Sequence, residues 1–449
     1  MDIANLFFLI IGVVTVLLSI ALLGVSLIEK EFFAAKRSIW LGIAGILLLV
    51  PAWWSWEGVS IMALAIAVVL AITAFYLFWP YSRKIKIDDW ATQIDERDIM
   101  FSRARMAPDS DRFKEYYQRK PENYILDKKW RKLPGLMSSN SKLNHRLLYA
   151  AADAGFATVE ALHPLVETNR KANTKANYSE KELTTFIKKW AQHLGALDCG
   201  ITVIKENHWY SHIGRGDEYG NEVRKSHKYA IAFTVEMSKE MMDSAPKAPC
   251  VMESSLQYLK AGTIATHITE FIRNMGYDAR AHIDGNYRLV CPTVAVDAGL
   301  GEIGRMGLLM TPKHGPRVRV AVVSTDMPLI ANKAQRDTSV IDFCRICKKC
   351  ADLCPAQAIE TGDRKELDGS LRWQINSEKC FTYWCSSGTD CGRCMSVCPY
   401  SHPNNWLHNI VRWMIRYFPN FRKVALIFDD FIYGRKPKTK PFPNWIPSK

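Results

Sequence analysis

Four cysteines between residues 343 and 355 stand at a spacing that can hold an iron–sulfur cluster. The segment FCRICKKCADLCP reads Cys-x2-Cys-x2-Cys-x3-Cys before a proline. This is the bacterial ferredoxin pattern, in which three thiolates bind one [4Fe–4S] cubane and the fourth reaches a second one. A shorter run, CGRCMSVCP at 391–399, repeats the Cys-Pro ending. The two runs therefore predict a pair of interlocked clusters that transfer single electrons.

The crossing pattern divides the cysteines between two clusters. One more ligand must come from upstream of the second run, where Cys380 and Cys385 are both available, and we assign Cys380. The first cluster is expected at Cys344, Cys347, Cys350 and Cys398. The second is expected at Cys354, Cys380, Cys391 and Cys394. Zinc is the alternative for paired Cys-x2-Cys motifs, but two longer motifs that each end in Cys-Pro are not a zinc arrangement.

A glycine pattern, AGLGEIGRMG, places Gly299, Gly301 and Gly304 at the spacing of a dinucleotide fingerprint. That interpretation needs a strand before the glycines and a helix after them. The preceding YRLVCPTVAV is compatible with a strand, but Pro312 and Pro316 leave no room for the helix. We interpret the motif instead as a glycine-rich turn that lets the backbone approach a large flat ligand.

The segments that must position these groups read as mixed α/β between about 140 and 340. ELTTFIKKWAQHLGA and YLKAGTIATHITEFIRNMG have helical spacing, the latter ended by Gly276, whereas YAIAFTVEM and VRVAVVSTD read as strands. Residues 83–135 are highly charged and read as a linker with short helices. The sequence thus predicts a globular domain followed by a cysteine-rich module.

The N-terminal eighty residues are apolar enough to predict three membrane-spanning helices. The runs IANLFFLIIGVVTVLLSIALLGVSLI, 38–56 and 58–82 are each long enough to cross a hydrocarbon layer of roughly 30 Å. Basic residues between the first two runs and after the third predict, by the positive-inside rule, that everything after residue 82 is cytoplasmic. A net charge of +14 suits an anionic inner leaflet, and no nucleic-acid-binding module is recognisable.

The expected organisation has five parts. They are a three-helix transmembrane anchor at 1–82, a charged linker at 83–139, a catalytic domain at 140–340, a two-cluster module at 341–403 and an aromatic, basic extension at 404–449. Twelve cysteines in a cytoplasmic domain argue for metal ligation rather than disulfides.

Several motifs together resemble the corrinoid- and iron–sulfur-dependent reductive dehalogenases. They are GYDARAH, VAVDAGLGEIGRMGLLMTPKHGPRVRVAVVSTDMPL, FCRICKKCADLCPAQAI and CGRCMSVCPYSHP, and the likeness covers roughly residues 140–410. It implies an α/β (α+β) chain with a nitroreductase-like corrinoid-binding core and a two-cluster ferredoxin-like module. The chain has no twin-arginine signal, and its apolar helices are fused to the catalytic part, so it is similar to the transmembrane subgroup of that family.

The resemblance also implies roles for individual residues. Matching SSLQYLKAG to the family pattern places the tyrosine proton donor at Tyr258, and its basic partner falls in GPRVRV at Arg317 or Arg319. An adjacent guanidinium stabilises the phenolate that remains after donation. The glycine turn and Asp284 are expected to line the site of a base-off cobalamin that has no histidine ligand.

The expected partners are a small organohalide, the membrane, and an electron donor that is a ferredoxin, a flavoprotein or a quinol. Two rival functions stay open from the sequence. One is an epoxyqueuosine-reductase-like tRNA-modifying enzyme, in which Asp243 would correspond to an acidic proton donor. The other is a membrane-bound iron–sulfur electron-transfer protein without a corrinoid.

Overall fold

The computed structural model describes residues 3–50, 57–81, 85–87, 92–168 and 170–447. By its internal contacts the chain divides into two compact units. The first comprises Met1–Lys84 and Pro403–Pro437, and the second comprises Ile85–His402 and Lys438–Lys449. Both units are built from discontinuous stretches of sequence, and each is described by itself below.

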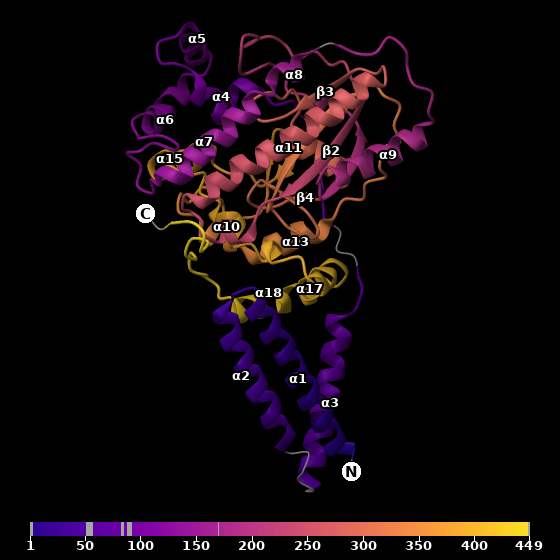
Figure 1. Ribbon diagram of the computed structural model, residues 1–449. Coiled ribbons are helices and arrows are strands. Elements are labelled where there is room, and N and C mark those ends of the chain that lie inside the picture. The colour runs from indigo at the N-terminus through magenta and orange to yellow at the C-terminus, as the bar shows by residue number, and fades with distance from the viewer. Residues whose placement is uncertain (1–2, 51–56, 82–84, 88–91, 169, 448–449) are drawn as a thin grey trace. The chain divides into compact units, whose positions relative to one another are not determined.

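The first unit contains five helices within its described residues. They are α1 (Ile3–Ile28), α2 (Phe32–Leu49), α3 (Glu57–Leu77), α17 (Trp406–Tyr417) and α18 (Phe421–Ile432). Helices α1 and α2 pack together as a hairpin, and α17 and α18 are drawn across one end of α1 and α2 (Figure 1).

Within the described residues, two of these helices are long and apolar enough to cross a membrane, Asn5–Ile28 and Phe32–Leu49. The third predicted span does fold as α3, but its described apolar stretch is only Ala63–Leu77, shorter than the ~20 residues a bilayer requires. The expectation of three spans is therefore corrected to two. The second helix also lies earlier than the predicted 38–56: it runs from Phe32 to Leu49 and ends just before Pro51, which has no amide hydrogen to continue the helical hydrogen bonds. Residues 51–56 and 82, where two predicted spans end, lie outside the described residues.

The second unit is centred on an antiparallel sheet in the order β1-β2-β6-β3. The strands are β1 (Asp198–Val203), β2 (Tyr229–Glu236), β6 (Val318–Thr325) and β3 (Ala279–His282). The sheet register pairs Ile231 with Ile201 on one side and with Val323 on the other. The central strands are buried on both faces, so they read in the sequence as continuous apolar runs rather than as an alternating pattern.

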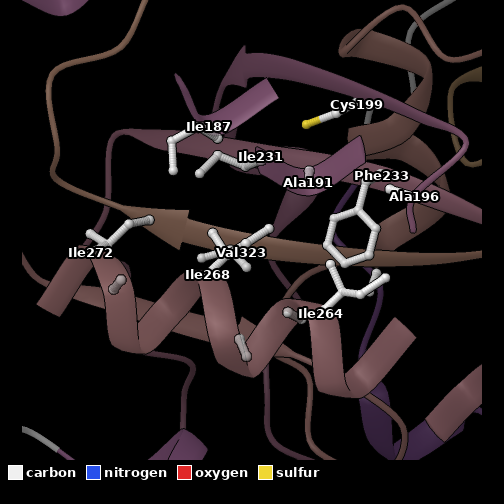
Figure 2. Packing of buried hydrophobic residues seen from close by; sticks show 14 of the residues in the cluster. Ile187, Ala191, Ala196, Cys199, Ile231, Phe233, Ile264, Ile268, Ile272 and Val323 are labelled. Carbon is white, nitrogen blue, oxygen red and sulfur yellow. The ribbon is translucent and has the colours of Figure 1, made fainter. Parts of the chain in front are cut away.

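One face of the sheet is covered by α9 (Glu180–His193) and α11 (Pro249–Asn274). Figure 2 shows Ile264, Ile268 and Ile272 of α11 directed at Phe233 and Val323 of the sheet. Ser179 forms a capping box with Glu182 at the start of α9, and Gly276 turns the chain after α11 with a φ of 84°. Both predicted helices and both predicted strands are confirmed.

The other face packs against α12 (Cys291–Asp297). This segment was expected as a strand before the glycine motif and is instead a helix, with Pro292 in its first turn, a position where proline is pre-organised for helical geometry. The glycine motif therefore lacks the preceding strand that a dinucleotide-binding fingerprint requires. The glycines lead into a short hairpin of β4 (Glu302–Ile303) and β5 (Leu309–Met310).

The remaining elements surround this core. Short helices occupy the charged linker, as predicted: α4 (Met100–Arg105), α5 (Asp111–Arg119) and α6 (Pro121–Arg131). They are followed by α7 (Arg146–Glu160), α8 (His163–Glu167) and, later, α10 (Lys239–Asp243). The cysteine-rich segment contains α13 (Thr338–Cys347), α14 (Lys349–Asp352), β7 (Lys365–Leu367), β8 (Ser370–Arg372), α15 (Ser377–Ser387) and α16 (Arg393–Ser396).

Candidate functional site

The first predicted cluster site is a small hollow in the cysteine-rich segment. Helix α13 carries Cys344 and ends at Cys347, where Lys348 adopts a left-handed conformation with a φ of 58° and redirects the chain. The hollow is lined by four cysteines together with basic and aromatic side chains. Those cysteines are Cys344, Cys347, Cys350 and Cys398. They are the four that the crossing pattern assigns to one cluster.

The second predicted group also converges. The thiol of Cys394 lies within electrostatic reach of three other cysteines of this group and also of Cys350 from the first group. The three from its own group are Cys354, Cys380 and Cys391. Cys385, the other candidate, lies instead in an apolar cluster with Trp130 and Phe381, where burial raises the pKa of its thiol to about 11. The geometry therefore favours Cys380 over Cys385 as the fourth member.

Thiol spacing bears on the choice between a cluster and zinc. Within the described residues no three cysteine, histidine or carboxylate side chains converge closely enough to hold a single metal ion. A cubane binds each thiolate through a different iron atom, so its ligands stand farther apart than the four ligands of one zinc ion. The four cysteines around the hollow are too far apart to bind one zinc ion together, so their spacing fits an iron–sulfur cluster better.

Two buried cations lie beside the first group of cysteines. Arg305 and Lys349 are each 1% exposed, and both line the hollow. The Arg305 guanidinium donates to the carbonyl oxygens of Cys344 at 3.0 Å and Gly362 at 2.6 Å, and it lies 4.5 Å from the ring centroid of Trp373. Every acceptor found for Arg305 in the described chain is a backbone carbonyl. A buried guanidinium without a carboxylate partner is suited to an anionic cluster.

The predicted proton donor, Tyr258, lies on α11 beside a guanidinium. The Cζ atom of Arg319, on β6, is 4.7 Å from the centroid of the Tyr258 ring. The positive charge of Arg319 lowers the pKa of this phenol, but burial and the charges of Asp284 and Asp390 outweigh it, and the net pKa is raised. The Tyr258 hydroxyl has no hydrogen-bond partner within the part of the chain that the structure describes. It is therefore a protonated phenol available to a ligand.

Arg319 is held by two further groups. Its Nη2 atom donates to Ser254 Oγ at 2.6 Å and lies 3.4 Å from Asp390 Oδ2, and Ser254 Oγ donates to the same carboxylate oxygen. Burial raises the pKa of Asp390 against the opposing charge of Arg319. Because Asp390 directly precedes Cys391, this network links the Tyr258 site to the second group of cysteines.

Arg317, the alternative partner, points elsewhere. It is 1% exposed, and it donates to Ser401 O at 3.2 Å, to Glu236 Oε1 at 2.7 Å and to the carbonyl of Met237. These contacts join the end of β2 to the segment after Cys398. The sequence left Arg317 and Arg319 equivalent, and the geometry brings only Arg319 to Tyr258.

Three charged or phenolic groups at this site were missed by the sequence reasoning. The Arg215 guanidinium lies 4.6 Å from the ring centroid of Tyr287 and donates to its hydroxyl, and Arg215 Nε is 3.1 Å from Glu96 Oε1. Glu96 is 1% exposed and also accepts from the Gly214 amide. Arg215 acts electrostatically on both Tyr258 and Asp284. These residues come from the linker and from loops without periodicity, so no sequence pattern marked them.

Asp284 lies in a turn closed by the pairing of Ile283 with Asn286, and its carbonyl accepts from His163. Burial raises the pKa of its carboxyl, against the opposing charges of Arg215, Arg105 and Arg319. The predicted ligand contact of Asp284 stays a prediction, but its charge reaches the Tyr258 site.

The three glycines of the motif serve different purposes. A Cβ atom at Gly301 would lie 2.2 Å from the carbonyl oxygen of Met310, so the hairpin itself requires this glycine. Gly299 has a φ of 84°, which side chains disfavour. A Cβ at Gly304 would meet the Met310 side chain and come within 3.6 Å of Cys344 Sγ. The motif therefore places a close backbone turn against the first cysteine group.

Polar atoms around Tyr258 fit a bound group with a polar edge. Arg319 Nε, Asp390 Oδ1 and Gln257 Oε1 are buried and have no hydrogen-bond partner among the residues that the structure describes. In contrast, both ring nitrogens of the buried His282 are engaged, one by Ser324 Oγ at 2.8 Å and the other by a backbone amide. The residues present are compatible with a large cofactor that takes no ligand from His282.

A comparison with family models matches residues 343–402 to a 4Fe-4S dicluster domain. Over 291 residues the chain is 33% identical to the tetrachloroethene reductive dehalogenase of Sulfurospirillum multivorans, covering 57% of this chain and 58% of that protein. Over 215 residues it is 35% identical to the tetrachloroethene reductive dehalogenase of Desulfitobacterium hafniense, covering 45% of this chain and 38% of that protein. The chain thus spans between about two fifths and three fifths of these relatives.

Solved structures give the same relationship. A catabolic reductive dehalogenase superposes with a TM-score of 0.58 at 27% identity, over 64% of this chain and 42% of that one. A second structure of that enzyme superposes with a TM-score of 0.64 at 22% identity, over 80% of this chain and 48% of the other, and at this identity shows the fold alone. By sequence and by fold the chain is homologous to the reductive dehalogenases, and the resemblance inferred from its motifs is confirmed.

Proposed function

We propose that this chain is a corrinoid-dependent reductive dehalogenase that replaces a halogen with hydrogen in a small organohalide. The reaction consumes two electrons and one proton, R–X + 2e⁻ + H⁺ giving R–H + X⁻. The single observation that carries the proposal is the pairing of Tyr258 with Arg319 next to two converging groups of cysteines. The homology to reductive dehalogenases supports it.

Each part of this site has a distinct task in the proposed reaction. Two [4Fe–4S] clusters, one at each cysteine group, relay single electrons, and a base-off corrinoid in a nitroreductase-like core would supply the two-electron chemistry at cobalt. Tyr258 donates the proton through its free hydroxyl. Arg319 stabilises the phenolate that remains, because a guanidinium close to a phenol favours its charged form. Ser254 and Asp390 hold Arg319 in place.

The raised pKa of Tyr258 suits this task. The phenol stays protonated at neutral pH, so the donor is in its competent state before each turnover. After donation, the negative charge on the phenolate is stabilised chiefly by the guanidinium of Arg319 and to a smaller extent by that of Arg215. Loss of the Arg319 charge should therefore impair proton transfer while leaving the donor in place.

The proposed location is the cytoplasmic membrane, with the apolar helices as an anchor and the second unit as the catalytic part in the cytoplasm. Helices α1 and α2 support an anchor by length and composition. The basic residues Lys30, Lys36 and Arg37, close to the turn between α1 and α2, support a cytoplasmic position for that turn. The electron donor is proposed to be a ferredoxin, a flavoprotein or a quinol.

The geometry of the site favours the dehalogenase over both rival functions. Asp243, the candidate acid of a tRNA-modifying enzyme, is bound by Lys239 at 2.7 Å and by Lys440 at 2.8 Å. A pure electron-transfer protein has no need for a half-buried phenol beside a guanidinium.

The test is to purify the protein anaerobically and to compare it with a variant that lacks the Tyr258 hydroxyl. Cofactor content is measured by absorption and by metal analysis, and dehalogenation by halide release with a strong artificial reductant. Tyr258→Phe should reduce turnover ~10²–10⁴-fold, the usual contribution of a general acid, while retaining cobalt and iron. Tyr277→Phe, which removes a hydroxyl from the core behind α11, is the matched control and should retain activity. Iron without any corrinoid would refute the proposal.

A further inference from the structure

Helix α17 carries its apolar stripe on the outside. Trp406, Ile410, Trp413 and Tyr417 are 57%, 47%, 54% and 51% exposed. Their spacing of four, three and four residues puts all of them on one face. In a surface helix of a water-soluble protein, the apolar stripe faces the core and the polar residues face water. The apolar stripe of α17 instead faces outward.

The inward face of α17 carries two buried polar side chains, His408 and Arg412, beside the buried Ile415. His408 Nε2 is 3.0 Å from Glu29 Oε1, which also accepts from Asn405 at 2.6 Å. The side chains of Glu29 and His408 are only 5% and 8% exposed. Arg412 is buried and donates to the carbonyl of Pro403 at 3.3 Å. Polar contacts thus fix α17 to the end of α1 and leave its aromatic face outward.

Helix α18 repeats this arrangement. Arg422 is buried and donates to the carbonyl of Ile415 at 2.8 Å, whereas Ile427 and Phe428 are exposed. The Arg37 guanidinium, on α2, lies 4.9 Å from the ring centroid of Phe431. The apolar face therefore occurs on both C-terminal helices of the first unit.

The turn between α17 and α18 is attached to the end of α3. Phe78 contacts the rings of Phe418 and Phe421 at centroid distances of 5.4 and 5.9 Å, and Asn420 donates to the carbonyl of Tyr76 at 2.8 Å. All these contacts are at one end of the apolar helices, so α17 and α18 lie across that end within their unit (Figure 1).

The ends of α1 and α2 that lie next to α17 and α18 also expose apolar side chains. Ile28 and Phe32, on either side of the turn between α1 and α2, are also exposed. Tryptophan and tyrosine favour the headgroup level of a bilayer, and exposed Arg416 and Lys423 can meet lipid phosphates. This chemistry fits a lipid–water interface.

We infer that α17 and α18 are interfacial helices whose aromatic faces enter the headgroup region of a phospholipid bilayer. The inference rests on the proposed membrane anchor and extends it from the N-terminal helices to a segment more than three hundred residues later in the chain. The membrane-associated part of the protein is then bipartite, with spanning helices at one end of the sequence and interfacial helices near the other.

Depth-resolved fluorescence quenching tests this inference on the full chain in phospholipid nanodiscs. Nitroxide-labelled lipids quench nearby tryptophans, with the label placed either close to the headgroups or close to the bilayer centre. Of the chain's 14 tryptophans, Trp406 and Trp413 are replaced together by phenylalanine, which keeps the face apolar. Compared with the wild type, the double variant should lose part of the fluorescence that the shallow label quenches, at most the part emitted by these two tryptophans. The fluorescence quenched by the deep label should change less.

Trp40→Phe separates the inference from the anchor on which it rests. Trp40 is 65% exposed on α2, so its removal should lower lipid quenching if that helix is in the membrane. Failure of all three tryptophans to report lipid contact overturns the anchor. A response from Trp40 with none from Trp406 and Trp413 overturns only the interfacial helices. Quenching of those two by aqueous iodide, or protection from both quenchers by a covering protein, also overturns the inference.

Discussion

Substitution of Arg317 tests whether this arginine stabilises the fold, in contrast to Arg319, which is proposed to assist the reaction. Arg317→Met keeps most of the apolar length of the side chain and removes the guanidinium that joins Ser401 and Met237. Both acceptors are backbone carbonyls in buried surroundings, and each costs ~1–3 kcal/mol when left without a donor. The third contact, with Glu236, adds little, because that carboxylate is 41% exposed and stays hydrated.

These contributions sum to about 4 kcal/mol of lost stability. An unfolding entropy of ~2.1 cal/mol/K per residue over the roughly 330 residues of the second unit gives ~0.7 kcal/mol per kelvin. The expected fall in the apparent unfolding temperature is therefore about 6 °C. The measurement is anaerobic thermal unfolding of the full chain in detergent, with bound iron determined before and after heating.

Arg319→Met is the matched variant, and it should behave in the opposite way. It removes the charge beside Tyr258 and should lower turnover at least ~100-fold. Its stability loss should be smaller, because Asp390 already has a raised pKa and can take up a proton when its partner is removed. If Arg317→Met were thermally unchanged but inactive, and Arg319→Met retained turnover, the two roles would be reversed and the reasoning wrong.

Three further outcomes are expected. Cys380→Ser should reduce the iron bound per chain and alter the cluster EPR signal, whereas Cys385→Ser should retain wild-type iron; the reverse would reassign the fourth ligand. Gly200→Ala would place a Cβ 2.2 Å from a carbonyl oxygen at the end of α12, so it should cost ~1–3 kcal/mol in unfolding measurements. Gly362→Ala, which has open space, is its control and should be nearly neutral. Finally, a donor must be protonated, and the pKa of Tyr258 is raised above its usual value of about 10. The pH profile of kcat/KM should therefore show no loss from this group below pH ~10, and a Tyr258-dependent alkaline loss near pH 8 would contradict the assignment.

The convergence of the two cysteine groups and the positions of the main strands could be predicted because their signals are local. Thiolate spacing indicates a cluster through a few adjacent residues, and the strand Val318–Thr325 is rich in β-branched valines and interrupted only by Arg319 before its polar end. The helix at Cys291–Asp297 was missed because its valines also suit a strand, and the proline in its first turn was not weighed as a helix start.

The surroundings of Tyr258 could not be predicted, because they depend on contacts between distant segments. Glu96 precedes Arg215 by more than a hundred residues, and their ion pair leaves no periodic trace in the sequence. Arg317 directly precedes β6 and Arg319 lies two positions later on it, so the alternation of an extended chain alone would place both on one face. Only the structure distinguishes them, since one donates to backbone carbonyls and the other to Ser254.

The return of the chain from the first unit to the second has a consequence for biosynthesis. The polypeptide passes between the units after Lys84, after His402 and after Pro437, and its last segment packs on the second unit through Lys440 and Asp243. A ribosome therefore releases the final residues of the catalytic unit only after α17 and α18 have been made. Deleting the N-terminal helices alone would leave the exposed aromatic faces of α17 and α18 in water. A soluble version should therefore also replace residues 403–437 with a short polar connection.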